Sequence, residues 1–575
     1  MTTGSLLEEF APVNTDSWEQ AIHKDLKGAD YAKKLIWQTA EGLAVKPYYR
    51  KEDLAALGSS ACNSGHRSKN DWHIREEIDI VDPEQANRAA QNALAAGAEE
   101  VTFLNVNIQN SSDLGLLLVN LESIPIHFQN ADKRLLRLLL ERHQHRPDSA
   151  PFSPGWNPLK DPEFATELLL GSKPAFAPFT IDGSGLEESG ATSVEEIGIT
   201  LAATIDYLSE MTSRNIDLER AATAIEFSFS IGSNYFFQIA KFRAFRKLFA
   251  NVLAGFDETH ASLPARIHAR TSRWNKTIYD PHVNILRATT EAMSAALGGV
   301  DSLTVAAFDE CYKAPDEASR RLARNTQIIL KQEALLGRVA DPGAGSYYLE
   351  VITDFLAREG WTCMQQIEAA GGYRKAAANG PLTQMLAKKQ AARNKTVAQR
   401  RRVFTGTSQY ANAEEKALDR IEESRISSGQ RGAHGFEQLR LRTERHAART
   451  GKTPRVLLAS FGDGKLSAAR SAFAQNFFAC AGFRIVTQSF QNTNEIASSD
   501  PDLIVLCSSN PEYPALAAQV LFALRAMDLH VPVLVAGNPE SAEQLREIGI
   551  ADFIHIRSNP IDVLTAWQQR LGVEA

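Results

Sequence analysis

The residues with the clearest chemical potential follow a short apolar run near the C-terminus. After Val456–Ser460 the chain continues as Phe-Gly-Asp-Gly-Lys-Leu-Ser, which contains Asp463 and Lys465, and a helical pattern comes next. A glycine-flanked loop that enters a helix can hold an anion through its backbone N–H groups. The loop is not a P-loop, because no second glycine stands at the required spacing before the lysine. Residue types alone therefore give a weak signal for anion binding.

Two other patterns invite a chemical interpretation, and a structural one is favoured for both. Gly183 and Gly185 resemble the start of a dinucleotide-binding loop, but Glu188 stands where the third glycine is needed. The cysteines form no Cys-x-x-Cys pair, which argues against a zinc knuckle or a disulfide framework. The residues expected to be buried and reduced are Cys62, Cys311, Cys363, Cys480 and Cys507.

The elements that would position such residues are short β-like runs that alternate with amphipathic helices between about residues 76 and 375. Runs such as Val101–Val106 precede helical patterns such as Asp132–His143. The pattern Ser193–Met211 opens with a capping-box spacing of Ser193 and Glu196. Strands separated by helices pair in parallel, and a segment this long is typical of a closed (β/α)8 barrel. We predict this barrel over residues 41–395, after an N-terminal arm over residues 1–40.

A polar segment over residues 396–454 interrupts the alternation and predicts a linker. Its basic side chains are Arg431, Arg440, Arg442, Arg445, Arg449 and Lys452. They would suit an anion-binding tract, but a solvated linker over two domains is the favoured interpretation. Residues 455–575 return to the alternation and predict five strands of a flavodoxin-like doubly wound sheet. Ligands of such sheets bind beyond the carboxyl ends of the strands.

The overall composition excludes several classes of function. The chain of 575 residues has a net charge of -7, so it lacks the basic excess of a general nucleic-acid binder. No apolar run approaches the roughly 18 to 20 residues that a membrane span needs. Glu8 and Glu9 stand where a secretory signal would be basic and then apolar. We therefore expect a cytoplasmic protein that binds neither membranes nor nucleic acid.

Six blocks in the predicted barrel carry a resemblance to a known family. They are Ser189–Thr192, Ile231–Phe237, Ala240–Ala244, Glu291–Met293 with Leu297–Gly299, Ala323–Gln327 and Asp341–Tyr348. Their order, together with the barrel, linker and C-terminal sheet, resembles the methylmalonyl-CoA mutase family of adenosylcobalamin enzymes. The resemblance extends from about Trp18 to the end of the chain. It implies an acyl-CoA mutase barrel followed by a domain of the cobalamin-binding type.

The resemblance also implies that the C-terminal domain is degenerate. Catalytic members carry Asp-x-His-x-x-Gly in the first loop of this domain, where the histidine ligates cobalt. Here Asp463 matches the aspartate, but Lys465 replaces the histidine and Ala468 replaces the glycine. A lysine ammonium has no free lone pair near neutral pH. Of the family's Ser-x-Leu and paired-glycine signatures, Ser508 and Gly537 remain, so we expect no cobalamin or metal to be bound by this chain.

The barrel departs from the family in a similar way. Catalytic members carry a Tyr-His pair before the Gly-Ala-Thr block, and Ser184 and Gly185 occupy those positions here. Glycine has no side chain that can polarise a thioester carbonyl. Glu333 matches an acid that faces the adenosyl group in active members. His555, at the end of the last predicted strand, is a possible replacement ligand, although a structural role is favoured.

The resemblance thus implies the small, non-catalytic subunit of a heterodimeric isomerase of propionate metabolism. Its large partner would hold adenosylcobalamin and interconvert (R)-methylmalonyl-CoA and succinyl-CoA. The arm contains Trp18, Tyr31 and Trp37 and is long enough to wrap a partner, although packing on its own barrel is equally possible. One alternative is a catalytic acyl-CoA mutase with altered cobalamin ligation, and another is a binding or regulatory module. Whether side chains fill the barrel axis stays open.

Overall fold

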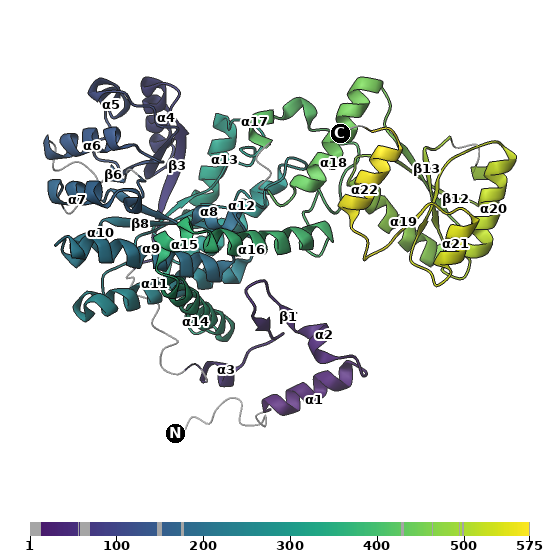
Figure 1. The fold of residues 1–575 in the computed structure, drawn as a ribbon, viewed down its shortest axis with the longest axis horizontal. Helices are drawn as coiled ribbons and strands as arrows, with labels where there is room; N and C mark the ends of the chain where they lie inside the picture. The colour runs from purple at the N-terminus through teal and green to yellow at the C-terminus, as the bar shows by residue number, and fades with distance from the viewer. Residues whose placement is uncertain are drawn as a thin grey trace.

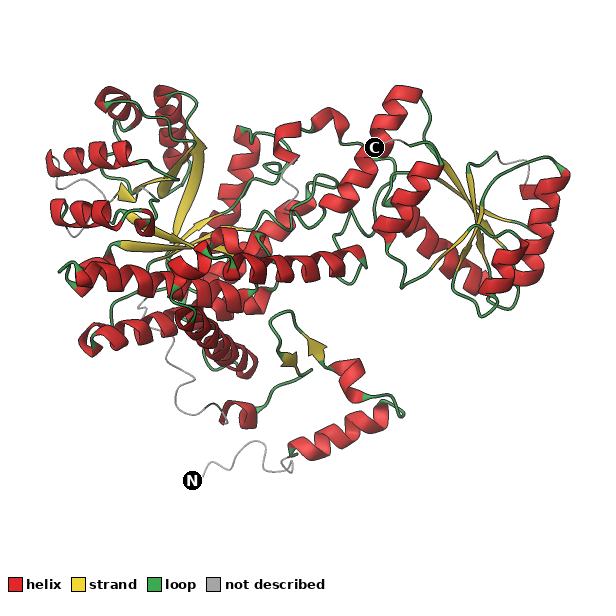
Figure 2. Ribbon diagram, in the orientation of Figure 1, coloured by secondary structure: helices red, strands yellow, loops and turns green. Residues whose placement is uncertain are grey.

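The chain forms two α/β units joined by a helical linker, with the N-terminal arm beside the first unit (Figure 1). The computed structural model describes residues 13–55, 57, 69–145, 152–153, 155–173, 177–426, 431–462, 464–493, 495–496 and 500–573. Strands lie at the centre of each unit and helices surround them (Figure 2). Both units therefore have the layered architecture of alternating βα segments.

The first unit is a parallel barrel, as predicted. Its strands are β3 (His73–Asp79), β4 (Glu100–Leu104), β5 (Ile126–Phe128), β6 (Phe152–Ser153), β7 (Phe179–Asp182), β8 (Ile225–Ile231), β9 (Ile267–Thr271) and β10 (Ser302–Thr304). They pair in the order β6-β5-β4-β3-β10-β9-β8-β7. A bridge between Trp156 and Phe179 joins the two ends, and the Trp156 carbonyl accepts a hydrogen bond of 2.9 Å from the Thr180 N–H.

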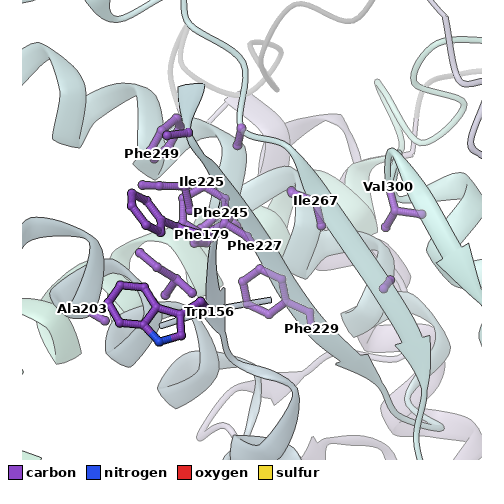
Figure 3. Packing of buried hydrophobic residues seen from close by; sticks show 14 of the residues in the cluster. Trp156, Phe179, Ala203, Ile225, Phe227, Phe229, Phe245, Phe249, Ile267 and Val300 are labelled. Carbon is purple, nitrogen blue, oxygen red and sulfur yellow. The ribbon is translucent and has the colours of Figure 1, made fainter. Parts of the chain in front are cut away.

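Helices cover the outside of the barrel and bury the apolar face of each strand. They are α4 (Pro83–Ala95), α5 (Ser111–Leu117), α6 (Lys133–His145), α7 (Pro162–Gly171), α8 (Ser184–Glu188), α9 (Ser193–Ser213), α10 (Leu218–Thr223), α11 (Tyr235–Phe256), α12 (Val283–Leu297), α13 (Glu317–Ile328), α14 (Tyr347–Ala369) and α15 (Tyr373–Ala378). Phe227 of β8 packs against Phe245 and Phe249 of α11, with ring centroids 4.8 and 5.1 Å apart (Figure 3). Such edge-to-face pairs stabilise the sheet–helix contact.

Helix α9 has the predicted capping box, but its N-cap lies one residue earlier than expected. Thr192 is the N-cap, and its backbone N–H donates a hydrogen bond of 2.9 Å to the Glu195 carboxylate. The predicted cap pair of Ser193 and Glu196 is therefore wrong by one position. The shift leaves Glu196 free to face the core, where its carboxylate lies 3.0 Å from the Lys241 ammonium.

In the structure the N-terminal arm continues past residue 40. It consists of α1 (Thr15–Asp25), α2 (Tyr31–Leu35), the hairpin β1 (Trp37–Gln38) and β2 (Ala44–Val45), and α3 (Lys51–Ala55). Neither α1 nor α2 buries a residue, and the arm projects beyond the barrel (Figure 1). Trp18 and Trp37 are 49% and 48% exposed. Two ring contacts, Trp37 with Phe237 and Tyr49 with Tyr348, join the arm to the barrel helices.

The linker follows α16 (Pro381–Ala398) and contains α17 (Glu423–Ile426) and α18 (His434–Thr450). The expectation of a solvated segment is wrong for α18. Arg440 is 1% exposed, stacks on the Tyr279 ring at 3.7 Å and donates to the carbonyls of Asn412 and Glu415. Arg431 is also buried and pairs with Glu437. These arginines anchor the helix between the two units, whereas Arg445, Arg449 and Lys452 are exposed.

The second unit is the predicted doubly wound sheet. Its strands are β11 (Arg455–Ser460), β12 (Arg484–Ser489), β13 (Leu503–Cys507), β14 (Val533–Ala536) and β15 (Asp552–Ile554), and its helices are α19 (Gly464–Ala479), α20 (Tyr513–Ala526), α21 (Ala542–Ile548) and α22 (Pro560–Arg570). The parallel order β12-β11-β13-β14-β15 is that of flavodoxin-like folds. Its topological switch point lies between β11 and β13.

Two sequence expectations concern burial and membrane contact. Cys311, Cys363, Cys480 and Cys507 are buried free thiols, as predicted, whereas Cys62 lies outside the described residues. Among the described residues, no helix is both long and apolar enough to cross a bilayer.

Trp274 connects the two units through the linker. The indole lies between the guanidinium groups of Arg393 and Arg402, at 4.2 and 4.3 Å, and is 2% exposed. It belongs to the same apolar cluster as Phe436 of α18 and Val456 of β11. A Cβ on Gly432 would lie 2.5 Å from the indole, so the linker backbone approaches it closely.

We expect Trp274→Ala to lower the free energy of unfolding by about 3 to 5 kcal/mol, because it removes a buried indole and leaves a cavity. Urea denaturation followed by circular dichroism measures the effect. Trp18→Ala is the matched control, since its half-exposed ring should change stability by no more than about 0.5 kcal/mol. Equal losses in the two variants would contradict the assigned role of Trp274.

Candidate functional site

The inner face of the barrel is polar and charged. Bulky apolar side chains fill most barrels of this type. Here the inward-facing residues are Arg75, Glu77, Glu100, Thr102, His127, Ser153, Thr180, Glu226, Ser228, His268 and Arg270. The sequence offered no signal for this interior, because its members are spread over seven strands.

Arg75 closes the barrel axis. Its guanidinium donates to Glu100 at 2.7 Å and to both carboxylate oxygens of Glu226 at 2.9 and 2.7 Å. Because β9 and β10 lie between β3 and β8, the contact with Glu226 crosses the interior. Burial alone would raise the pKa of Glu226, but the adjacent guanidinium outweighs it and holds the pKa well below its usual range.

A second set of ion pairs crosses the mouth of the barrel. Arg270 donates to both oxygens of Glu77, at 2.8 and 2.9 Å, and to Glu310 at 2.7 Å. Glu310 also accepts from Arg273 at 3.2 Å. Burial would raise the pKa of Glu310, yet these arginines lower it to about 2. Glu310 is therefore ionised and paired, with no role as a proton donor near neutral pH.

Two cavities remain above these pairs, at the carboxyl ends of the strands. The larger measures about 580 Å³, and Arg75, His127 and Ser184 are among its lining residues. The smaller, about 420 Å³, lies between the barrel and the linker and contains Glu188. Burial raises the pKa of Glu188, although Arg273 and Arg270 partly offset it. In the sequence, Glu188 argues against a dinucleotide loop, but no local pattern predicts its place in a cavity.

The positions of the family's Tyr-His pair lie on α8. The Ser184 hydroxyl and backbone N–H both donate to Asp182, at 2.6 and 2.9 Å. Gly185 is exposed, and a Cβ added there would meet nothing within 4 Å. Space alone therefore does not require glycine at this position. Position 185 has room for a larger residue, but glycine provides no side chain there that can polarise a carbonyl.

Glu333 lies apart from these cavities. It ends a π-helical turn, Ile329–Glu333, that follows α13, and it is exposed. Two residues earlier, the Lys331 ammonium donates to the Trp72 carbonyl at 2.8 Å, just before β3 begins. This places Glu333 near the amino end of β3, while the cavities lie at the carboxyl ends of the strands. Its adenosyl-facing role stays a prediction.

The carboxyl edge of the second sheet is occupied by its own side chains. Glu512 accepts hydrogen bonds from the hydroxyls of Ser508 and Ser509, each at 2.6 Å. Its carboxylate also lies against Gly462, where an added Cβ would clash with it. Glu512 therefore ties the loop after β13 to the loop after β11, across the switch point where ligands of such folds bind.

Arg470 of α19 fills the adjoining part of this edge. Its guanidinium donates to the Ala536 carbonyl at 2.5 Å and to the Asn510 amide oxygen at 2.9 Å. Gly537 follows, with a φ of 156°, and a Cβ there would collide with the same guanidinium. Lys465 and Ala468 are exposed on the first turns of α19, and Asp463 lies outside the described residues.

The described rim does not fit a cobalt-bound cobalamin. At the loop where the family's histidine stands, Lys465 offers an ammonium in place of an imidazole. Arg470 and Glu512 span the space that a ligand at the edge would need. Among the described residues, no cluster of His, Cys, Asp or Glu has a geometry that could hold a metal. His555 accepts a hydrogen bond at Nδ1 from the Arg557 N–H at 3.1 Å.

A parallel barrel followed by a flavodoxin-like sheet defines the class of protein, and comparisons with known proteins identify the family. The methylmalonyl-CoA mutase family profile matches residues 164–456. The chain is 34% identical to a methylmalonyl-CoA mutase small subunit of Porphyromonas gingivalis, over 99% of each chain. A small subunit of Streptomyces virginiae is 30% identical over 99% of this chain and 98% of that one. The chain belongs to the methylmalonyl-CoA mutase family, which confirms the resemblance.

A third relative gives a measure of the kinship with other family members. The Escherichia coli protein named methylmalonyl-CoA mutase is 29% identical over 74% of this chain and 68% of that protein. The two small subunits thus align over a larger share of this chain.

We expect Arg75→Met to lower the free energy of unfolding at pH 7 by about 3 to 5 kcal/mol, because two buried carboxylates lose their shared cation. In the wild type the depressed pKa of Glu226 stabilises the fold above its unfolded pKa, and this contribution is lost as the pH falls. The variant lacks that contribution, so its deficit should keep its full size from pH 7 to about pH 5 and shrink as the pH falls below about pH 4.5. Urea titrations at several pH values measure this.

Arg137→Met provides the control for Arg75→Met. Arg137 lies 3.5 Å from Glu167 in an exposed pair, so its loss should cost at most about 1 kcal/mol. A deficit for Arg75→Met that stays constant with pH would show that lost packing, and not unpaired charge, causes it.

Proposed function

We propose that this chain is the non-catalytic small subunit of a heterodimeric methylmalonyl-CoA mutase. Its role is to support a large catalytic subunit that interconverts (R)-methylmalonyl-CoA and succinyl-CoA. The observation that carries the proposal is the barrel axis, where Arg75, Glu100 and Glu226 occupy the space that an acyl-CoA chain would need to pass. Full-length similarity to proteins named small subunits supports the same conclusion.

The chemistry of the reaction then belongs to the partner chain. Gly185 gives this barrel no side chain to polarise a thioester, and the charged groups at its mouth are paired with one another. A catalytic mutase with altered ligation would need replacements in both units. We therefore infer that adenosylcobalamin, the source of the radical when bound, is held by the large subunit and not by this chain.

The N-terminal arm suits a role in subunit pairing. Its first two helices bury no residue within this chain, and its two tryptophans are half exposed. Indole rings are favoured at protein interfaces because they bury a large apolar area. We propose that the arm contacts the large subunit and that the complex acts in the cytoplasm, without binding membranes or nucleic acid.

We expect the purified chain to retain no cobalamin after incubation with adenosylcobalamin and desalting. The reason is that Lys465 is a poor cobalt ligand and that Arg470 and Glu512 occupy the sheet edge. The visible absorption spectrum measures retention. The large subunit, treated identically, is the positive control. Stoichiometric cobalamin with a base-off spectrum would contradict the proposal and make His555 the first ligand to test.

We expect the double substitution Trp18→Ser and Trp37→Ser to weaken association with the large subunit at least tenfold. Loss of two interface tryptophans commonly costs that much, since about 1.4 kcal/mol is tenfold. Calorimetric titration of the two chains measures the affinity. Exposed Leu286→Ser, on α12, is the control. A weakened complex whose small subunit also melts earlier would point to packing within the arm instead.

A further inference from the structure

A third cavity, of about 320 Å³, lies away from the barrel mouth, between the linker and the second unit. Phe473 and Phe477 of α19 form one wall, and Ile556 stands on the loop after β15. The linker covers the cavity from the other side. Two hydrogen bonds fix the position of the linker here. The Tyr410 N–H donates to the Asn476 amide oxygen, and the Cys480 thiol donates to the Ser408 carbonyl.

Arg400 is the cationic residue of this cavity. Its backbone has a φ of 55°, a left-handed conformation that costs free energy for a residue with a side chain. In the part of the chain that is described, nothing accepts a hydrogen bond from its guanidinium. This conformation ends α16, because the Arg401 N–H donates to the Thr396 carbonyl at 2.9 Å across the turn. The turn leaves Arg400 in the lining of the cavity with an uncompensated charge.

His555 supplies a second donor. Because its Nδ1 accepts from the Arg557 N–H, the ring proton resides on Nε2. Burial and the nearby Arg557 lower the pKa of the imidazole, so the ring is neutral at neutral pH. No Asp or Glu is found among the described residues that line this cavity, unlike the two at the barrel mouth. A complementary ligand must therefore provide acceptors.

The apolar side of the cavity also includes an exposed side chain. Ile556 is 85% exposed, although it adjoins the rings of Phe473 and Phe477. Ligand sites of this size usually combine an apolar surface with a few convergent polar groups. The loop after β15 is also a carboxyl end of the parallel sheet, where ligands of doubly wound folds bind.

We propose that this cavity binds a small organic anion with an apolar body, such as an aryl phosphate or aryl carboxylate. The anionic group lies on the Arg400 guanidinium and the His555 Nε2–H. The ring or chain of the ligand covers Phe473, Phe477 and Ile556. The site is independent of the proposed subunit function, because none of its residues belongs to the barrel mouth or the arm.

Calorimetric titration of the full-length chain with three probes tests the proposal. Phenyl phosphate should bind at least tenfold more tightly than inorganic phosphate, which lacks the apolar body, and phenol should show no measurable binding. Arg400→Gln should weaken phenyl phosphate at least tenfold. Exposed Arg401→Gln, one residue further along, should bind like the wild type. Equal affinity for the two phosphates, or an unchanged Arg400→Gln, would overturn the proposal.

Two further variants separate binding from folding. Arg400→Gly should relieve the left-handed strain and raise the thermal midpoint while abolishing phenyl phosphate binding. Ile556→Asn should weaken phenyl phosphate but leave inorganic phosphate unchanged. Retained phenyl phosphate binding in Arg400→Gly would refute the role of the guanidinium. Similar losses of both phosphates in Ile556→Asn would refute the apolar contact.

Discussion

The ion pairs formed by Arg75 set the conditions for the rest of this molecule. One guanidinium neutralises two buried carboxylates that come from strands on different sides of the barrel, and all three side chains are less than 10% exposed. Removing charges from water costs several kcal/mol for each ion, so the geometry has to be close to ideal for the barrel to close. The same contact that permits closure blocks the axis.

The second unit is constrained in a comparable way by its own polar groups. Its sheet has apolar clusters on both faces, yet the switch point is closed by Glu512 and Arg470. Trp274 and α18 then fix this unit to the barrel through a continuous apolar cluster. The switch point of the second sheet is consequently used for internal contacts, whereas the barrel mouth retains two cavities. The fold also offers other molecules its outer surface, including the arm.

Local periodicity and family blocks predicted the fold well, because strand and helix signals depend on near neighbours in sequence. The five strands after Arg455 and the alternation of the barrel could be predicted in this way. The Arg75–Glu226 pair joins residues 151 positions apart, and no local pattern encodes it. The burial of Arg440 could not be predicted for a related reason. An arginine is expected to be solvated unless its partners are known, and here they are the Tyr279 ring and two linker carbonyls. Gly185 and Lys465 were informative from sequence because the lost chemistry follows from residue type alone.

A polar interior of this kind is difficult to replace one residue at a time. Substituting Arg75 alone removes the cation shared by two carboxylates and leaves Glu226 with Arg266 at 3.6 Å. Substituting Glu226 alone leaves the guanidinium with Glu100 and an empty acceptor position. Each single change therefore leaves a buried charge with less compensation, although a simultaneous apolar replacement of the whole set can be neutral. Among the described residues, the hydroxyls of Thr102, Thr180 and Ser228 have no hydrogen-bond partner, and they carry no such penalty because they face the cavity. A chain released from catalysis can therefore lose the side chain at a position such as 185 without a cost in stability. The charged residues on the barrel axis persist, because the stability of the barrel depends on them.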